Sequence, residues 1–378
     1  MPDVVVVGAG PVGMLLAGLL TRRGVEVEVL ERRPAAGGGS RAIGVHAPVL
    51  SALEGYGISE RLLAHATRVP CGEARSGGRV LGTVRFDRLS TRFPFVATLP
   101  QSATEAVLSA DAPEPLRGAS VSAIDARGDR IRVRAGIGGR PTERSAPLVV
   151  VASGSGARDL VYRSTAASVR DYRDRYLMTD AAVDERPDAD VAVVNLERSG
   201  VLESFPLPDG RRRFVAWDPP DADPAPDARA RRLAAALRTS GESADAVTEA
   251  TAFGVRRFVA PSLRRGRLFV IGDAAHEVSP IGGQGMNLGL LDAATLAPLL
   301  ADWVHDGDPP EAELRRWEQR RVRSARTAAA LASVNTALGR SLPPAADAAR
   351  RAVVRTMLAP PFGAVFARAY AMGFDRDA

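Results

Sequence analysis

The chain has 378 residues, of which 46% are hydrophobic, and this is enough to bury one large core or two cooperating cores. All 50 basic residues are arginines, the formal net charge is +6, and acidic and basic residues are interleaved along the chain. A globular fold rather than extended disorder is therefore expected. No nucleic-acid partner is expected, because such a partner is indicated by a block of like charges rather than by the total.

The cysteine count and the apolar runs predict a cytoplasmic protein. Cys71 is the single cysteine, so no disulfide can form within the chain and a reducing compartment is expected. Strand-like sequence begins at Asp3, which leaves no room for a signal peptide, and no run of about 18 apolar residues is present to span a membrane. Four dispersed histidines and one cysteine give no metal-ligand spacing, so no metal is expected.

The first predicted elements form a parallel βαβ unit. Val4–Val7 is a short apolar β-branched run, and Met14–Leu20 has the apolar periodicity of a buried helix. A second strand is expected at Val25–Leu30, joined to the first through a right-handed crossover. The chain therefore begins as an α/β fold.

The turn between the first strand and the helix reads GAGPVG and contains Gly8, Gly10, Pro11, Val12 and Gly13. Its glycines allow a tight turn, the approach of a pyrophosphate to the backbone, and close packing of helix on strand. The diphosphate would lie at the positive N-terminus of the helix. Glu31 ends the second strand, where a carboxylate can accept hydrogen bonds from ribose hydroxyls, and Arg32 follows it. This motif predicts a dinucleotide site but does not separate FAD from NAD.

The middle of the chain has the alternating pattern of antiparallel strands. This pattern occurs over residues 80–96 and again in three segments, Val191–Val194, Val201–Phe205 and Arg213–Trp217. A Pro-Asp-Gly sequence between the second and third of these segments predicts a turn. An amphipathic helix is expected around Ala230–Arg238, and a strand of the parallel type at Leu268–Ile271. Helical periodicity then dominates from Gly283 to about Leu338.

A second glycine-rich segment follows that late strand. It reads GDAAH from Gly272 to His276, has Pro280, and continues as GGQGMN up to Asn287. The segment resembles the second FAD signature of the p-hydroxybenzoate hydroxylase-like, or group A, flavoprotein monooxygenases. Other features also fall where that family has counterparts, so that the resemblance covers nearly the whole chain: the Gly8–Gly13 turn, Glu31, Arg41, Gln101 and the helix Trp317–Arg321.

The resemblance implies a set of FAD contacts. Asp273 would accept a charge-assisted hydrogen bond from the ribityl chain or the sugar-phosphate linkage. The glycines after Pro280 would let backbone N–H groups and the positive end of the next helix face the flavin pyrimidine ring. Arg41 and Gln101 would donate to the cofactor, with a surface salt bridge or a helix cap as the alternative. The expected FAD-binding residues are Gly8, Gly10, Pro11, Val12, Gly13, Glu31, Arg32, Arg41, Gln101, Gly272, Asp273, Pro280, Gly283, Gly285, Met286 and Asn287.

No catalytic side chain is assigned, because in this family the flavin carries the chemistry and the protein binds, orients and shields it. His276 and Pro280 are expected near the flavin. Histidine titrates near neutral pH, but support of the loop is the preferred role for His276.

One departure from the family pattern concerns the reductant. Members usually carry a motif resembling GADGARSxVR between the two FAD signatures, linked to FAD and NAD(P)H binding. This chain reads SGSGARDLVY from Ser153 to Tyr162, so Ser155 replaces the aspartate and Asp159 replaces the serine. Neutral drift that preserves the turn and altered handling of the reductant both remain open as explanations.

The fold class predicted is α/β: a Rossmann-like FAD-binding domain with a parallel sheet, interrupted by a mostly antiparallel substrate domain, and a helical C-terminus. The expected boundaries are 1–65, 99–165 and 259–340 for the FAD-binding domain, 66–98 and 166–258 for the substrate domain, and 341–378 for the tail. The tail is expected to pack on the core or on a dimer partner, with a membrane-surface contact as the alternative.

The resemblance implies a monooxygenase, monomeric or homodimeric, that uses NADH or NADPH as a transient reductant of FAD. With O2 it would hydroxylate or epoxidise an aromatic, quinone-like or polyketide-type small molecule through a flavin C4a-hydroperoxide. Two alternatives stay open. One is another FAD-dependent oxidoreductase, such as a reductase, a halogenase-like enzyme or a redox-neutral enzyme, since the site rather than the fold decides function. The other is a non-catalytic flavin-binding protein.

Overall fold

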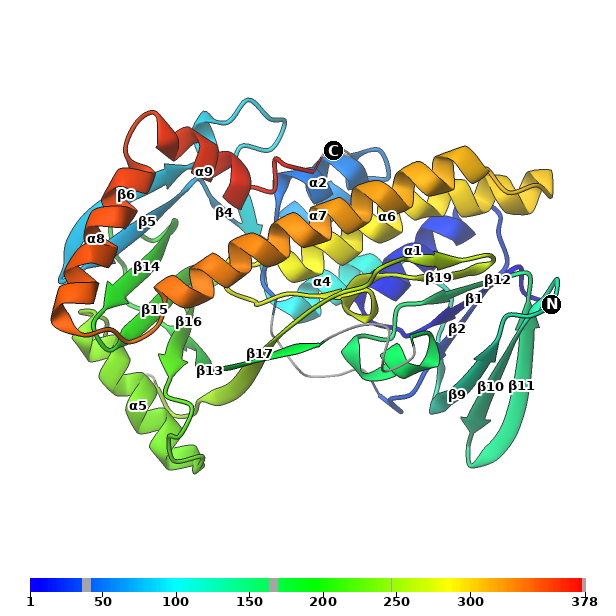
Figure 1. Ribbon diagram of the computed structural model, residues 1–378, viewed down its shortest axis with the longest axis horizontal. Coiled ribbons are helices and arrows are strands. Elements are labelled where there is room, and N and C mark those ends of the chain that lie inside the picture. Colours follow the sequence, from blue (N-terminus) through cyan, green and yellow to red (C-terminus); the bar gives the residue numbers. More distant parts are fainter. Residues whose placement is uncertain (36–41, 163–168, 246, 376–378) are drawn as a thin grey trace.

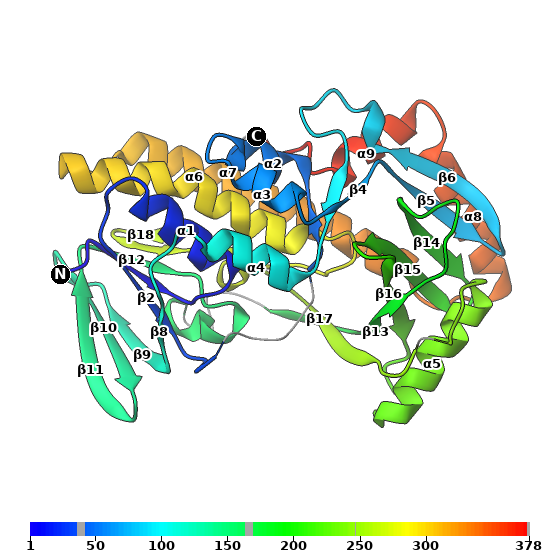
Figure 2. The same cartoon turned by 180° about the vertical axis from the view of Figure 1, so that it is seen from behind.

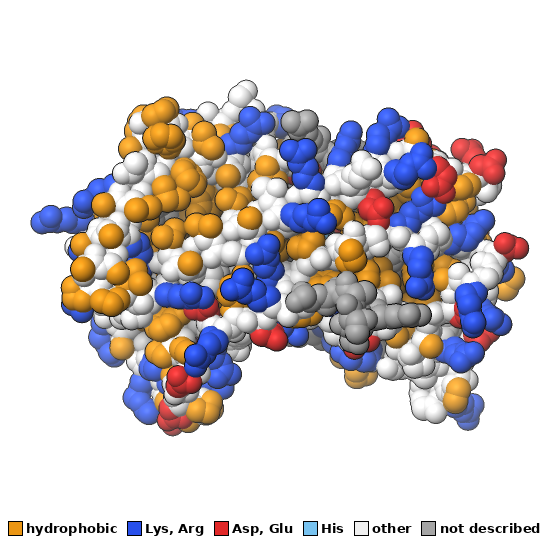
Figure 3. Space-filling model, in the orientation of Figure 1, with side chains coloured by type: hydrophobic (Ala, Val, Ile, Leu, Met, Phe, Trp, Pro, Cys, Tyr) orange, Lys and Arg blue, Asp and Glu red, His pale blue; other side chains and the backbone are white. Residues whose placement is uncertain are grey.

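The computed structural model describes residues 1–35, 42–162, 169–245 and 247–375 (Figure 1). Two large sheets lie at opposite ends of the molecule, and long helices run between them (Figures 1 and 2). Arginine side chains are scattered over the face seen in Figure 3, with apolar side chains between them. No helix of the described residues is long and apolar enough to cross a membrane.

The first sheet has six strands, and all its neighbours are parallel except the pair at one edge. In spatial order these strands are β18 (Arg264–Arg265), β19 (Leu268–Val270), β12 (Leu148–Val151), β1 (Val4–Val7), β2 (Val27–Glu31) and β8 (Leu116–Arg117). Helices pack over one of its faces: α1 (Pro11–Thr21), α4 (Gln101–Ser109), α6 (Gln284–Asp306) and α7 (Glu311–Leu338). On the other side lies a three-stranded antiparallel sheet, formed by β9 (Ala119–Asp125), β10 (Ile131–Ile137) and β11 (Arg140–Ala146).

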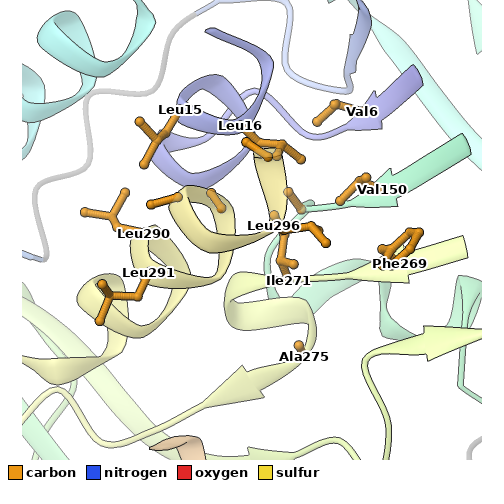
Figure 4. Close-up of a cluster of buried hydrophobic side chains, with 14 of the residues drawn as sticks. Val6, Leu15, Leu16, Val150, Phe269, Ile271, Ala275, Leu290, Leu291 and Leu296 are labelled. Atoms are coloured by element: carbon orange, nitrogen blue, oxygen red, sulfur yellow. The ribbon is translucent and has the colours of Figure 1, made fainter. Parts of the chain in front are cut away.

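The core of this half explains why its strands are continuous apolar runs. All four valines of β1 are at most 4% exposed, because helices cover one face of the strand and other strands flank it. Side chains from three neighbouring strands meet the leucines of α1 and α6 in one cluster, which includes Val6, Val150, Phe269, Leu15, Leu16, Leu290, Leu291 and Leu296 (Figure 4). Each such side chain contributes about 1.5–3 kcal/mol when it leaves water.

The second sheet has eight strands and is antiparallel except for the β14–β5 pair. Its spatial order is β20 (His276–Glu277), β17 (Thr251–Val259), β13 (Arg170–Ala182), β16 (Arg211–Asp218), β15 (Gly200–Leu207), β14 (Val191–Glu197), β5 (Cys71–Ser76) and β6 (Arg79–Arg85). The turn between β15 and β16 contains Asp209 and Gly210, both at positive φ (60° and 63°), as the Pro-Asp-Gly sequence predicts.

Helices cover both faces of the eight-stranded sheet. Helix α5 (Pro226–Thr239) packs on β13 and β16, and the C-terminal helices α8 (Pro344–Leu358) and α9 (Phe362–Tyr370) pack on β6. Within the segment 341–378, α8 and α9 thus lie against the sheet, whereas Asp375 pairs with Arg321 of α7. A smaller layer joins the two halves and consists of α2 (Ala47–Glu54), α3 (Ile58–Leu63) and the strands β3 (Gly44–Val45), β7 (Val96–Thr98) and β4 (Thr67–Val69).

The predicted fold class is confirmed, while several local predictions need correction. The alternating pattern over residues 80–96 forms a strand only to Arg85, followed by the 3-10 turn Phe86–Arg88 and a loop up to β7. The strands β9–β11, β13 and β17 were not predicted. Strand β13 contains several charged residues, and its buried and exposed positions do not alternate regularly. It therefore lacks the period-2 pattern by which a strand is recognised in a sequence.

Candidate functional site

A cavity of about 960 Å³ opens where the parallel strands end, between the six-stranded sheet and the eight-stranded sheet. The residues that follow β1, β2 and β12 line one end, as expected for ligand sites at the carboxyl edge of a parallel sheet. Most of the predicted FAD-binding residues line it, namely Gly8, Gly10, Pro11, Val12, Glu31, Arg32, Gln101, Gly272, Asp273, Pro280, Gly283, Gly285 and Met286. Two segments far apart in sequence therefore meet at one cavity.

The first glycine turn has the geometry of a dinucleotide cradle. A Cβ on Gly8 would lie 2.6 Å from the Ala152 carbonyl oxygen, and a Cβ on Gly13 would lie 2.0 Å from the Gly8 carbonyl oxygen. Gly13 does not line the cavity; its missing side chain lets α1 pack against the turn. Gly10 is the N-cap of α1, and a Cβ there would meet nothing within 4 Å. The positive end of α1 therefore faces open space that a phosphate can fill.

Glu31 joins the end of β2 to this turn. Its Oε2 accepts a hydrogen bond from the Ala9 amide at 2.8 Å, and its Oε1 accepts from the Arg33 amide at 2.8 Å. Burial raises the Glu31 pKa, but these bonds and the Arg33 guanidinium outweigh burial and lower it. The side chain is an ionised acceptor at the edge of the cavity.

The second motif is anchored by a buried charge network. Asp292 of α6 accepts hydrogen bonds from the Gly272 amide at 3.0 Å, from His276 Nε2 at 2.6 Å and from Arg321 Nε at 2.9 Å. Arg321 also pairs with Asp375, the last described residue, at 2.7 Å. His276 is 1% exposed and is not among the residues that line the cavity, and its proximity to the flavin stays a prediction. His276 supports the Gly272 loop through Asp292, which binds both the His276 ring and the Gly272 amide.

The glycine run after Pro280 begins helix α6. Gly282 and Gly283 have φ of 98° and 68°, a conformation that other residues rarely adopt, and Gly283 is the N-cap of α6. Asn287 does not face the cavity: its Oδ1 accepts from the His46 amide at 2.8 Å and its Nδ2 donates to the Gly44 carbonyl at 2.8 Å. In this structure Asn287 positions the neighbouring loop, and its expected contact with FAD stays a prediction.

Gln101 and Arg41 were the two donors expected beyond the glycine motifs. Gln101 lines the cavity at the start of α4, where its Oε1 accepts from the Ala42 amide at 3.3 Å and its Nε2 donates to Glu105 at 2.7 Å. Arg41 lies outside the described residues. The expectation for Arg41 therefore stays a prediction.

The altered middle motif folds as a 3-10 turn, Ser155–Leu160, at the cavity edge. Its Arg158 donates to the Asp273 carbonyl at 2.7 Å, pairs with Glu277 at 2.6 Å and lies 4.2 Å from the centre of the Phe258 ring. Asp159 lines the cavity, whereas the Ser155 hydroxyl accepts from Arg256 at 3.2 Å. The turn thus braces the second FAD segment through Arg158.

Several cavity residues were missed by sequence reasoning. His46 is buried with an unpartnered Nδ1, and burial lowers its pKa to about 4, so it is a neutral imidazole. The Ser153 hydroxyl is likewise buried without a partner in the described structure. These two polar atoms, the open helix N-terminus of α1 and the glycine cradle fit a large polar cofactor such as FAD. Ser153 begins the altered middle motif, whereas nothing in the spacing of His46 marks it as a cavity residue, because the fold alone brings it there.

The other end of the cavity is a mostly apolar wall. Alternate residues of β14, β15 and β16 face it, and so do side chains from α8 and α9. They include Val194, Val201, Phe205, Val215, Val354, Met357, Leu358 and Phe366. The polar exceptions on this wall include Glu203, Arg213, Asn335 and Tyr370. No group of three or more potential metal-binding side chains occurs in the part of the chain that the structure describes.

A family model described as "FAD binding domain" matches residues 1–332. The chain belongs to this FAD-binding family. The match includes both glycine-rich segments and every predicted FAD-binding residue, so the resemblance read from the two motifs is confirmed at the level of the family.

Named relatives of this FAD-binding chain are monooxygenases. It is 34% identical over 366 residues to 6-methylpretetramide 4-monooxygenase of Streptomyces rimosus, a match that covers 89% of this chain and 63% of the relative. It is 30% identical to rifampicin monooxygenase of Rhodococcus hoagii over 82% of this chain and 66% of that protein. The chain thus spans just under two thirds of the length of these relatives.

Solved structures share the fold. Anhydrotetracycline hydroxylase of Streptomyces rimosus matches with a TM-score of 0.77 at 26% identity, covering 98% of this chain and 76% of that one. The p-nitrophenol 4-monooxygenase of Pseudomonas putida DLL-E4 matches with a TM-score of 0.86 at 24% identity, covering 100% and 98%. The latter likeness concerns the fold alone.

Proposed function

We propose that this protein is an FAD-dependent monooxygenase that uses NADH or NADPH and O2 to oxygenate an aromatic, quinone-like or polyketide-type small molecule. The observation that carries the proposal is the single cavity that joins a dinucleotide cradle to an apolar wall. The names of the relatives support it, since they act on pretetramides, rifampicin and anhydrotetracycline. The division into an FAD-binding domain, a substrate domain and a C-terminal tail, with new segments beginning at residues 66, 99, 166, 259 and 341, is part of this proposal.

Two groups of residues would hold FAD. The turn Gly8–Gly13 and the N-terminus of α1 would receive the diphosphate, and Glu31 would accept from the ribose. Asp273, Gly283 and Gly285 would surround the flavin end, with Gln101 and Arg41 as further donors. The chemistry that FAD supplies when bound is hydride acceptance from a reduced pyridine nucleotide and activation of dioxygen.

The remaining task of the protein is to exclude water and orient the substrate. The apolar side chains of β14, β15 and β16 form one wall, and α8 and α9 close it from outside. Such a lining favours the burial of an aromatic ring, since apolar area removed from water contributes about 25 cal/mol per Å². We propose no side chain as a nucleophile. A cytoplasmic location and a monomeric or homodimeric state are part of the proposal.

The test has two stages. The purified protein should bind FAD, seen as flavin absorbance retained after gel filtration, and should consume NADPH or NADH faster when an aromatic ligand such as anhydrotetracycline is added. The product should gain one oxygen atom by mass spectrometry. Protein that folds normally yet refuses added FAD would remove the basis of the proposal. FAD-loaded protein that gives no oxygenated product with any member of an aromatic panel would favour another flavin-dependent oxidoreductase.

A further inference from the structure

Glu203 is an isolated carboxyl group on the apolar wall of the cavity. It lies on β15, is 5% exposed, and its side chain makes no hydrogen bond or ion pair with any described residue. Its neighbours across the sheet are Val194 of β14 and Val215 of β16, both of which also line the cavity. The carboxyl group faces the cavity without a protein partner, so a ligand that displaces solvent there would have to satisfy it.

The nearby polar groups do not satisfy it. Arg213 lines the same wall from β16, but its guanidinium binds Asp180 through two hydrogen bonds of 2.6 and 2.7 Å. The Tyr370 hydroxyl donates to Asn335 Oδ1 at 2.7 Å. Burial, unopposed by any cation, raises the pKa of Glu203 to about 8. Near neutral pH the group is therefore an uncharged acid that retains one O–H donor.

We propose that Glu203 in its acid form donates a hydrogen bond to a carbonyl oxygen of an uncharged polycyclic substrate. This inference rests on the proposed function, because it assumes that the apolar wall receives the substrate. A ligand carbonyl supplies the partner that the protein lacks, while the surrounding valines contact the rings. Glu203 is thus a specificity-determining residue, since a ligand without an acceptor at this point leaves a buried donor unpaired.

The other titratable groups around Glu203 do not compete with it in the relevant pH range. Those that interact with it electrostatically are Tyr176 of β13 and Tyr370 of α9. Burial and the Glu203 charge raise the pKa of both, that of Tyr370 to about 12. Arg213 keeps its ion pair with Asp180. A change in ligand affinity between about pH 6 and pH 9.5 would therefore report Glu203.

The probe is fluorenone, a tricyclic ketone that does not titrate, and its comparison compound is fluorene, which lacks the carbonyl. Binding to the FAD-loaded protein without reductant is measured by equilibrium dialysis across that pH range. Wild-type affinity for fluorenone should fall about tenfold as pH rises through 8, because an ionised carboxylate cannot donate. Glu203→Gln keeps a neutral donor, so it should bind within about threefold of wild type near pH 6 and show no pH dependence. Glu203→Leu should bind about tenfold more weakly near pH 6.

Controls separate this effect from general damage. Fluorene affinity should be the same in wild type and Glu203→Leu within about threefold, and it should not depend on pH. Glu73→Gln makes the same carboxyl-to-amide change elsewhere on the cavity, at a residue that is paired with Arg75. The pH dependence of fluorenone binding should persist in this variant. FAD content and melting temperature verify that each variant folds.

Three results would overturn the inference: no fluorenone binding to wild type, a pH profile that Glu203→Gln leaves unchanged, or a Glu203→Gln variant as weak as Glu203→Leu. The last would mean that the carboxylate accepts rather than donates. Since no turnover is measured, a protein that shows the expected binding pattern without oxygenating any compound would refute the monooxygenase proposal and leave the role of Glu203 standing. A protein that oxygenates an aromatic compound without showing this binding pattern would refute the role of Glu203 and leave the monooxygenase proposal standing.

Discussion

Replacing Asp292 with asparagine removes the charge at the centre of the buried network while keeping the shape of the side chain. Asp292 and Arg321 are both 0% exposed, and the carboxylate accepts from Arg321, from His276 and from the Gly272 amide. After the change, Arg321 retains Asp375 as its ion-pair partner in the network. Breaking a buried ion pair from one side costs about 3–5 kcal/mol, so we expect Asp292→Asn to lower the free energy of unfolding by about 3 kcal/mol.

The pH dependence of the loss follows from the Asp292 pKa. Burial raises that pKa, but the charges and hydrogen bonds of His276 and Arg321 outweigh burial and lower it. A carboxyl group with a lowered folded-state pKa stabilises the protein above its unfolded pKa, near 4, and loses that contribution as pH falls through the folded value. The difference between wild type and variant should therefore be complete near pH 7 and shrink below about pH 4.

The assay is urea unfolding followed by circular dichroism, near pH 7 and near pH 3. The matched control is Asp302→Asn, which makes the same chemical change at an exposed position of α6 and should alter stability by less than about 0.5 kcal/mol. A loss below about 1 kcal/mol near pH 7, or an equal loss at both pH values, would refute the reasoning. FAD affinity provides a second readout, because Asp292 holds the amide of Gly272 at the cavity.

Four further changes test the cradle and the wall. Gly13→Ala should destabilise the protein even without FAD, because its Cβ would lie 2.0 Å from the Gly8 carbonyl, whereas Gly10→Ala should leave stability intact and weaken FAD binding at least tenfold; equal melting curves for wild type and Gly13→Ala would contradict this. Glu31→Gln should weaken FAD binding about tenfold in a flavin fluorescence titration, since the ionised acceptor is lost; unchanged affinity would show that Glu31 serves only the turn. The acid form of Glu203 stabilises fully below about pH 4.5, and its contribution is lost as pH rises through about 8, so Glu203→Gln should gain about 3–5 kcal/mol over wild type across that window. A stability difference that does not grow with pH would count against the raised pKa.

Much of the FAD end was accessible from the sequence because its residues are defined by backbone requirements. Gly8, Gly13 and Gly283 occupy positions where a Cβ would clash or φ is positive. Such positions favour glycine, so a single sequence is enough to reveal them. His276 and Asn287 belong to the same motif, yet both turn away from the cavity. Motif membership says that a residue matters to the loop, and it does not say which way the side chain points.

The sequence by itself determined the α/β class and the two glycine-rich segments, because local spacing and backbone conformation suffice for these, and the family resemblance of the second segment pointed to FAD. Only the tertiary structure decided which side chains share the cavity. His46, Glu203 and Tyr370 come from β-sheet and helical segments more than a hundred residues apart, and their meeting depends on sheet register and helix packing. Burial decided the rest, since the same glutamate is an ordinary charged residue at a surface and an uncharged donor on an apolar wall.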